Sequence, residues 1–334
     1  AEDGSADRKK ATQGVLSIGV PGTVYGMWEV HQRFGSLPWA SLLKPAIKLA
    51  EDGFLISPFM ADALNKKYKE LSKFQNFKDI FYQEYPVTMN QKLKQLDLAK
   101  TLKTISNKGA KGFYEGGVAE KIDLFMKKNG GLITKKDLKN YRPIWRDTLR
   151  GNYNNYEIVT MGPPSSGGVH LIQMLNILEK YDLVDMGHNS STYTALLTES
   201  MKYAYADRSK YLGDPSFFNV PVKTLISKAY ADKINKKIKL DIITPSEEIL
   251  PGSEIHHESF DTTHFSIADK NGNVVSNTYT LNSGYGSGVV IDGTGILMNN
   301  EMDDFVSAPG VPNQFGLIGG EANKIEPFKR PLSS

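Results

Sequence analysis

The sequence predicts a mixed α/β protein in which helices dominate the region before residue 261 and strands follow it. Before residue 261, apolar residues recur at helical spacing in several segments, of which 39–50 is the clearest. From Thr262 onward, β-branched and aromatic residues alternate with polar ones, which is typical of strands. With 334 residues, 40% hydrophobic and 23% charged, the chain can bury a large core and form one large or two ordinary domains.

The helices of the first part are predicted from periodicity and end signals. The stretch 14–28 predicts a short apolar strand, a tight turn and a helix start, with Pro21 in the first helical turn. Gly53 lies where the helix over 39–50 should have its C-terminal cap, and Thr134 is the expected N-cap of a short helix. Further helices are expected over 58–72, 96–107, 116–128, 171–183 and 192–212, and a strand over 156–161.

The chain changes character at 241–261, where proline, serine and acidic residues predict an extended or mobile linker. A buried strand over 262–268 should follow, with Thr263, Phe265 and Ile267 on one face. Asp269–Asn273 predicts a hairpin turn, and 274–281 the returning strand. Two more strands are expected over 289–291 and 295–298.

Composition excludes several classes of function. Lys plus Arg (40) nearly balance Asp plus Glu (37), and the lysines are scattered, so nucleic acid is not an expected partner. The absence of cysteine rules out disulfides and thiol catalysis. No run is apolar enough to predict a membrane span, and the first ten residues lack the apolar core of a signal peptide.

Several motifs leave their chemistry open. The glycine-rich loop 282–288 does not match a nucleotide-binding motif, so it predicts a turn or an active-site loop. The PPSSGG stretch at 163–168 lacks the spacing of a nucleophile elbow and predicts a rigid turn that caps the next helix. No histidine pattern indicates a metal site, and His256-His257 is interpreted as a solvated pair. The acidic NNEMDD stretch at 299–304 fits a calcium-like cluster of oxygen ligands, an ammonium-binding site or a polar turn.

The Asp261–Thr262 junction has a specific chemical possibility. A threonine hydroxyl needs a base to become a nucleophile. If the peptide bond before Thr262 is cut, the new α-amino group, with a reference pKa near 8, is a base on the same residue. The cut itself can be intramolecular: the Thr262 hydroxyl attacks the preceding carbonyl, and water hydrolyses the resulting ester. Paired threonines that serve only to begin a strand remain the alternative.

Long motifs on both sides of this junction resemble the γ-glutamyltranspeptidase (γ-glutamyltransferase, glutathione hydrolase) family. Downstream, DTTHFSIADKNGNVVSNTYTLN, GILMNNEMDDF, PGVPNQFGLIGGEAN and KRPLSS resemble the start of the family's small subunit. Upstream, VPGTVYGM, PAIKLAEDGF, PPSSGGVHLIQMLNILE and YAYADRSKYLGDP resemble its large subunit. The resemblance covers nearly the whole chain.

The resemblance implies an N-terminal-nucleophile hydrolase fold, which is a four-layer αββα sandwich represented here by an incomplete chain. It implies one interleaved catalytic domain, in which 1–261 is the C-terminal part of the large (α) subunit and 262–334 the start of the small (β) subunit. The precursor cuts itself between Asp261 and Thr262, and the two subunits stay associated.

The resemblance also implies a role for each matching residue. Thr262 is the nucleophile, and Thr280 hydrogen-bonds its hydroxyl and assists processing. Asn282, Glu301 and Asp304 hold the α-amino group of the γ-glutamyl moiety, while Ser333 and Ser334 bind its α-carboxylate. Two carboxylates and an amide oxygen suit an ammonium group, since each charge-assisted hydrogen bond contributes about 1.5–3 kcal/mol.

The expected activity is γ-glutamyl transfer or hydrolysis from glutathione and related amides, with an amino acid, a dipeptide or water as acceptor and with no metal or organic cofactor. Alternatives are a poly-γ-glutamate depolymerase or an acylase of the same fold, or an inactive exported binding protein. The family implies a periplasmic or secreted location. An arginine and an oxyanion-hole glycine pair of the family lie outside this sequence, so the segment alone is not expected to be a competent enzyme.

Overall fold

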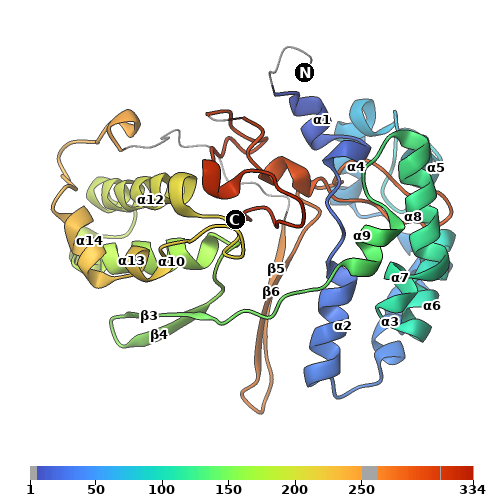
Figure 1. Ribbon diagram of the computed structural model, residues 1–334, viewed down its shortest axis with the longest axis horizontal. Helices are drawn as coiled ribbons and strands as arrows, with labels where there is room; N and C mark the ends of the chain where they lie inside the picture. Colours follow the sequence, from blue (N-terminus) through green and yellow to red (C-terminus); the bar gives the residue numbers. More distant parts are fainter. Residues whose placement is uncertain (1–5, 250–261, 309, 334) are drawn as a thin grey trace. The chain divides into compact units, whose positions relative to one another are not determined.

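A computed structural model describes residues 6–249, 262–308 and 310–333. The chain forms two compact units (Figure 1). Unit 1 comprises Ala1–Arg8, Trp145–Ser259 and Asp303–Ser334, and unit 2 comprises Lys9–Ile144 and Phe260–Met302. Each unit therefore joins segments from both sides of residue 262.

Unit 2 is built mainly from helices whose ends the local sequence predicts. α3 ends at Asp52, and Gly53 adopts a φ of 80° at its C-cap. At the start of α9 the Asp137 amide donates to the Thr134 hydroxyl, and the Thr134 amide donates to the Asp137 carboxylate. The predicted helices over 39–50, 58–72, 96–107 and 116–128 are confirmed. The helices of this unit are α1 (Arg8–Thr12, whose first residue belongs to unit 1), α2 (Thr23–Phe34), α3 (Trp39–Asp52), α4 (Pro58–Leu71), α5 (Gln75–Phe81), α6 (Leu96–Lys108), α7 (Lys111–Tyr114), α8 (Gly116–Asn129) and α9 (Lys135–Asn140).

In unit 2, the predictions of a strand within 14–28 and of strands over 289–291 and 295–298 are wrong. Within 14–28, Val15–Ser17 forms the short 3₁₀ helix η1, and α2 begins only at Thr23, two residues after Pro21. The segments 289–291 and 295–298 contribute one isolated antiparallel bridge, between Val290 and Leu297. Val289, Ile291 and Met298 are instead buried among helical residues such as Ile122. Burial in a helical core, rather than pairing in a sheet, explains their apolar character.

The predicted hairpin of unit 2 is confirmed, but its predicted burial is wrong. Strands β5 (Thr263–Ala268) and β6 (Val274–Tyr279) pair antiparallel, with Thr263 opposite Tyr279. Asp269 fixes the turn because its carboxylate accepts from the Asn271 and Asn273 amides. Every residue of β5 is exposed, although the alternation predicted one buried face. The second sheet of this unit pairs β1 (Phe54–Leu55) with β2 (Lys92–Leu93).

In unit 1, a layer of helices packs against one β-hairpin. β3 (Leu149–Tyr153) and β4 (Tyr156–Thr160) pair antiparallel, and α10 contacts β3, α12 and α14 (Figure 1). The predicted helix over 171–183 runs from Gly167 to Leu178, so it begins and ends earlier than its apolar pattern indicates. The helix predicted over 192–212 is confirmed as α12. The α-helices of this unit are α10 (Gly167–Leu178), α11 (Leu183–Met186), α12 (Ser191–Tyr211), α13 (Val222–Leu225) and α14 (Lys228–Asn235). Its 3₁₀ helices are η2 (Ser246–Glu248), η4 (Glu321–Asn323) and the part of η3 (Glu301–Asp304) that begins at Asp303.

Helix α12 carries buried polar groups that tie other segments to it. Lys202 Nζ donates to a Glu199 carboxylate oxygen at 2.8 Å and to the Thr244 carbonyl at 2.8 Å. The Thr244 amide donates to the same Glu199 oxygen. The beginning of the predicted linker at 241–261 is therefore held against α12, while 250–261, including His256 and His257, lies outside the described residues.

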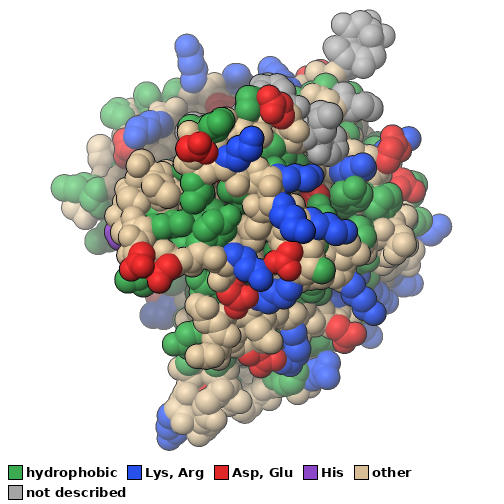
Figure 2. Space-filling view, turned by 90° about the vertical axis from the view of Figure 1, so that its left-hand side faces the viewer, with side chains coloured by type: hydrophobic (Ala, Val, Ile, Leu, Met, Phe, Trp, Pro, Cys, Tyr) green, Lys and Arg blue, Asp and Glu red, His purple; other side chains and the backbone are tan. Residues whose placement is uncertain are grey.

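The surface carries mixed charges. Figure 2 shows basic and acidic side chains interspersed over one face around smaller apolar areas. No helix within the described part of the chain is long and apolar enough to cross a bilayer. The same residues contain no group of three or more His, Asp or Glu side chains placed to hold a metal ion.

Candidate active site

The hairpin of unit 2 places Thr262 opposite Thr280. Thr262 immediately precedes β5 and Thr280 immediately follows β6, so the register of the two strands brings the residues together. The Thr262 hydroxyl donates to the Thr280 hydroxyl oxygen at 3.4 Å, and the Asn282 amide donates to the same oxygen at 2.9 Å. Thr262 is exposed, whereas Asp261 lies outside the described residues.

Asn282 is held in a left-handed conformation close to Thr280. Its φ is 75°, which asparagine tolerates better than most residues with a side chain. The side-chain amide donates to the Asn300 carbonyl at 3.1 Å, and the Asn300 amide donates to the Leu281 carbonyl. Within the described residues, no hydrogen bond reaches Asn282 Oδ1. That oxygen is available to accept a hydrogen bond from a cationic ligand.

Glu301 begins η3 and is positioned through its main chain. Its amide donates to Asn299 Oδ1 at 3.0 Å, and Asn299 also exchanges two hydrogen bonds with the Gly19 main chain. Asn299 thereby fixes the start of η3 to the segment that precedes α2. The Glu301 side chain is half-buried.

Two neighbouring aspartates in η3 have different environments in unit 1. Asp303 is buried, which raises the pKa of its carboxyl group, and it accepts from the Gln314 amide at 3.0 Å. Asp304 is half-buried, and its Oδ1 accepts from the Asn313 side chain at 3.3 Å. Asp304 also lies within electrostatic reach of the buried Arg208 guanidinium. Asp303 therefore holds a loop, while the Asp304 carboxylate is less buried and is directed toward Asn313 and Arg208.

Main-chain hydrogen bonds hold Ser333 against the PPSSGG stretch in unit 1. The Ser166 amide donates to the Ser333 carbonyl, and the Ser333 amide donates to the Pro164 carbonyl, both at 2.8 Å. These bonds form a parallel bridge between Ser165 and Ser333. Ser166 is the N-cap residue of α10, where the predicted turn places it, and its carbonyl accepts from the His170 amide, but its side chain makes no capping hydrogen bond. Half-buried Ser333 is held through its main chain, and Ser334 lies outside the described residues.

The structure thus groups the predicted residues within each unit. In unit 2, hydrogen bonds connect Thr262, Thr280 and Asn282. In unit 1, Asp304 and the main chain next to Ser333 share a partner that sequence analysis did not identify, Asn323. The other supporting residues that it missed are Asn299, Asn300, Asn313 and Ser166. All of these residues lie in motifs that were recognised, Asn313 and Asn323 in PGVPNQFGLIGGEAN, but the motifs do not indicate which groups their polar atoms contact.

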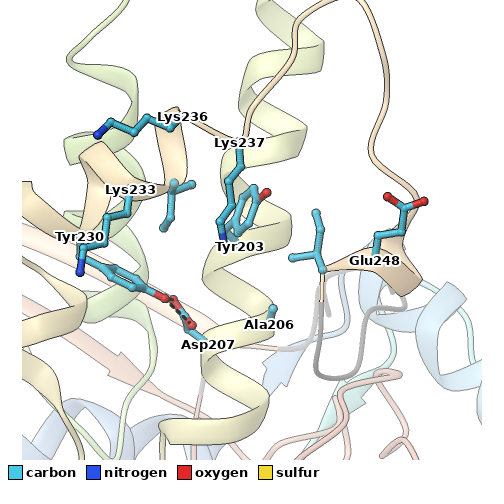
Figure 3. Close-up of a pocket in the computed structure, with 10 residues that line it drawn as sticks. Tyr203, Ala206, Asp207, Tyr230, Lys233, Lys236, Lys237 and Glu248 are labelled. Atoms are coloured by element: carbon cyan, nitrogen blue, oxygen red, sulfur yellow. Dashed lines mark hydrogen bonds between the residues drawn. The ribbon is translucent and has the colours of Figure 1, made fainter.

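A hollow of about 630 Å³ in unit 1 contains none of the predicted site residues. Its floor includes Asp207, whose carboxylate accepts from the Tyr230 hydroxyl at 3.0 Å (Figure 3). Burial raises the pKa of Asp207, although hydrogen bonds from Gln173 and Tyr230 oppose this shift. These internal bonds are consistent with a structural carboxylate between α12 and α14.

Comparison with known proteins decides the family. The family model described as gamma-glutamyltranspeptidase matches residues 1–334. The chain belongs to the γ-glutamyltranspeptidase family. A glutathione hydrolase proenzyme of Escherichia coli strain K12 is 46% identical over 335 residues, which cover 100% of this chain and 58% of the relative. The chain thus spans little more than half the length of this relative.

Solved structures agree with the family assignment. γ-Glutamyltranspeptidase from Helicobacter pylori is 45% identical, with a TM-score of 0.73 over 78% of this chain and 75% of that chain. Cephalosporin acylase from Bacillus halodurans is 28% identical, with a TM-score of 0.82 over 97% of this chain and 57% of that chain. The fold is therefore that of the N-terminal-nucleophile hydrolases. Within the described residues, the αββα sandwich is represented by helices and three two-stranded sheets.

Proposed function

We propose that the full-length protein transfers or hydrolyses the γ-glutamyl group of glutathione and related γ-glutamyl amides. The observation that carries this proposal is the hydrogen bond between Thr262 and Thr280 at the head of the hairpin. A threonine held there by a second hydroxyl is suited to be a nucleophile once its own amino group is freed. The 46% identity to a glutathione hydrolase proenzyme supports the choice of substrate.

The proposed processing divides the chain at Asp261–Thr262, with 1–261 in the large subunit and 262–334 in the small one. The Thr262 hydroxyl attacks the Asp261 carbonyl, and the peptide bond is replaced by an ester. Water hydrolyses this ester, which leaves a carboxylate on Asp261 and a free α-amino group on Thr262. The Thr280 hydroxyl supports the reacting oxygen during this step.

The proposed catalytic cycle uses the groups that processing creates. The Thr262 α-amino group accepts the proton of its own hydroxyl, and the oxygen attacks the γ-carbonyl of the donor. The tetrahedral intermediate collapses to a γ-glutamyl ester, and the leaving amine takes the proton. An amino acid, a dipeptide or water then attacks the ester, which restores the Thr262 hydroxyl and releases a γ-glutamyl product or glutamate.

Donor recognition follows the charges of the γ-glutamyl group. We assign Asn282 Oδ1, Glu301 and Asp304 to the α-ammonium group, because each offers an oxygen acceptor. Ser333 and Ser334 are assigned to the α-carboxylate. Asn282 supports this assignment most directly, since its side-chain nitrogen is already used by the Asn300 carbonyl and its oxygen faces no donor among the described residues.

A second candidate is an acylase that acts on amides without an α-amino group, which the likeness to a cephalosporin acylase favours. A γ-glutamyltransferase needs Glu301 and Asp304 to bind the α-ammonium group of its donor, whereas an acylase for amides without that group does not. A γ-glutamyl anilide and the corresponding glutaryl anilide, which lacks the amino group, separate them directly. We also propose export from the cytoplasm, on the strength of the family.

The nucleophile is tested by Thr262→Ala in the full-length protein. We expect the variant to remain one band in denaturing electrophoresis and to lower amine release from a γ-glutamyl anilide by roughly 10⁴-fold or more. The wild type should give two fragments, the smaller beginning Thr-Thr-His. Thr263→Ala is the matched control and should still be cleaved before Thr262. Turnover retained in Thr262→Ala would exclude Thr262 as the nucleophile.

A further inference from the structure

Asn323 occupies a connecting position in unit 1 that its place at the end of the PGVPNQFGLIGGEAN motif does not indicate. It is the last residue of η4, and only 3% of its surface is exposed. Its side-chain nitrogen donates to the Asp304 carbonyl at 2.6 Å, and its side-chain oxygen accepts from the Leu332 amide at 2.9 Å. One side chain therefore joins the main chain of Asp304 to the residue before Ser333.

The orientation of this amide is set by its partners. A main-chain N–H can only donate and a main-chain carbonyl can only accept, so the oxygen of Asn323 must face Leu332 and the nitrogen must face Asp304. The Asn323 main chain adds two bonds, from its amide to the Gly320 carbonyl and from the Val306 amide to its carbonyl. All four directional groups of the residue are thus occupied.

The Leu332 end of this connection is firmly anchored. The Leu332 side chain is buried with Val169, Leu212 and Leu225, and Ser333 is bound on its other side by the PPSSGG stretch. At the other end, Asn323 binds the Asp304 main-chain carbonyl, while the Asn313 side chain donates to the Asp304 carboxylate. Because Leu332 and Ser333 are fixed in this way, the hydrogen bonds of Asn323 also fix the main chain of Asp304 relative to Ser333.

We propose that Asn323 is a positioning residue that sets the spacing between Asp304 and Ser333 and thereby the preference for donors that carry both an α-ammonium and an α-carboxylate group. The inference rests on the proposed function, in which Asp304 holds the first group and Ser333 the second. Both charges sit on one carbon of the donor, so a shift of either residue weakens recognition of the pair. A donor without the amino group is less sensitive to this shift.

Asn323→Asp tests the connection with little change in shape. The new carboxylate still accepts from the Leu332 amide but has no hydrogen to donate to the Asp304 carbonyl. In the full-length protein we expect the KM for a γ-glutamyl anilide to rise about tenfold, which corresponds to about 1.4 kcal/mol, while kcat changes less. The preference for this donor over a glutaryl anilide should fall by a similar factor.

Asn176→Asp is the matched control for a buried amide. Asn176 is 2% exposed, lies in the same unit and donates to the Ile226 carbonyl at 2.8 Å, outside the proposed site. Its replacement should lower stability without changing the donor preference. An equal change in preference for both variants would show a general loss of structure and would overturn the inference.

A double-mutant cycle with Asp304→Asn separates positioning from other effects. If Asn323 acts through Asp304, the two replacements should be strongly non-additive in kcat/KM. Additive effects of the two replacements would overturn the inference about Asn323 but not the proposed function. The same holds if folded and cleaved Asn323→Asp keeps the KM and the donor preference of the wild type. If Asn323→Asp does not fold, Asn323→Ser, which removes the connection without adding charge, decides by the same criteria. A wild type without γ-glutamyl turnover would overturn the proposed function as well.

Discussion

Single polar residues of unit 1 differ in function according to their burial. Asp303 and Asp304 are adjacent and chemically identical, yet buried Asp303 accepts from the Gln314 amide whereas half-buried Asp304 accepts from the Asn313 side chain. His170 provides a third case, because its ring is buried beside Tyr205 with the centroids 4.9 Å apart. Burial, together with the nearby Arg208 charge, lowers the pKa of His170 to about 3.

The buried His170 predicts a loss of stability in acid. The unfolded ring binds a proton below about pH 6.5, whereas the folded ring stays neutral until about pH 3. The unfolded state therefore binds more protons in this range, and the unfolding free energy falls as the pH drops, by at most about 1.4 kcal/mol per pH unit. Urea unfolding at pH 7 and pH 5 measures the difference.

His170→Gln should be less destabilised by acid than the wild type between these two pH values. His188→Gln, at an exposed histidine of the same unit, is the control and should follow the wild type. Identical acid dependence in the wild type and His170→Gln would assign the effect to other groups.

Helices and turns follow the local sequence where their end signals are local. α3, α9 and the β5–β6 turn form where a glycine C-cap, a threonine N-cap and an Asp-Lys-Asn-Gly turn predict them. The predicted strand at 289–291 fails because apolar residues that fill a helical core and apolar residues of a short strand have the same pattern. Periodicity over three residues cannot separate the two.

The capping box of α9 predicts a measurable stability effect. Thr134→Ala removes the hydroxyl that accepts from the Asp137 amide, so we expect the unfolding free energy to fall by about 1 kcal/mol. Thr134→Ser keeps the hydroxyl and should lose only a fraction of that amount. Urea unfolding of the three proteins provides the comparison, and equal stability of Ala and Ser at this position would refute a role for the cap.

At the scale of the whole molecule, each unit contains a hydrophobic core cluster that combines residues from the two sides of residue 262. In unit 2, Val289, Ile291 and Met298 pack with residues that precede Ile144. In unit 1, Leu332 packs with Val169 and residues that follow it. Cutting the chain before Thr262 breaks one covalent bond but leaves these buried contacts in place.

The shared cores predict that the two cleaved fragments remain associated. In size-exclusion chromatography without denaturant, we expect both fragments of the processed full-length protein to elute together, and to separate only after unfolding in urea. Ile291→Asp should weaken this association, because it places a charge in the core of unit 2, whereas Asp292→Asn at the neighbouring exposed position should not. Separation of the wild-type fragments under native conditions would contradict the prediction.

The sequence alone determined the family, the main helices, the hairpin and the identity of the proposed nucleophile, because these depend on motifs and on contacts between residues near one another in the chain. The Thr262–Thr280 contact was predictable for the same reason, since a hairpin register brings the two residues together. Only the tertiary structure decided that Asn323 joins Asp304 to Leu332, that PPSSGG holds Ser333 and that β5 is exposed. These features depend on hydrogen bonds and burial between distant segments, which leave no periodic trace in the sequence.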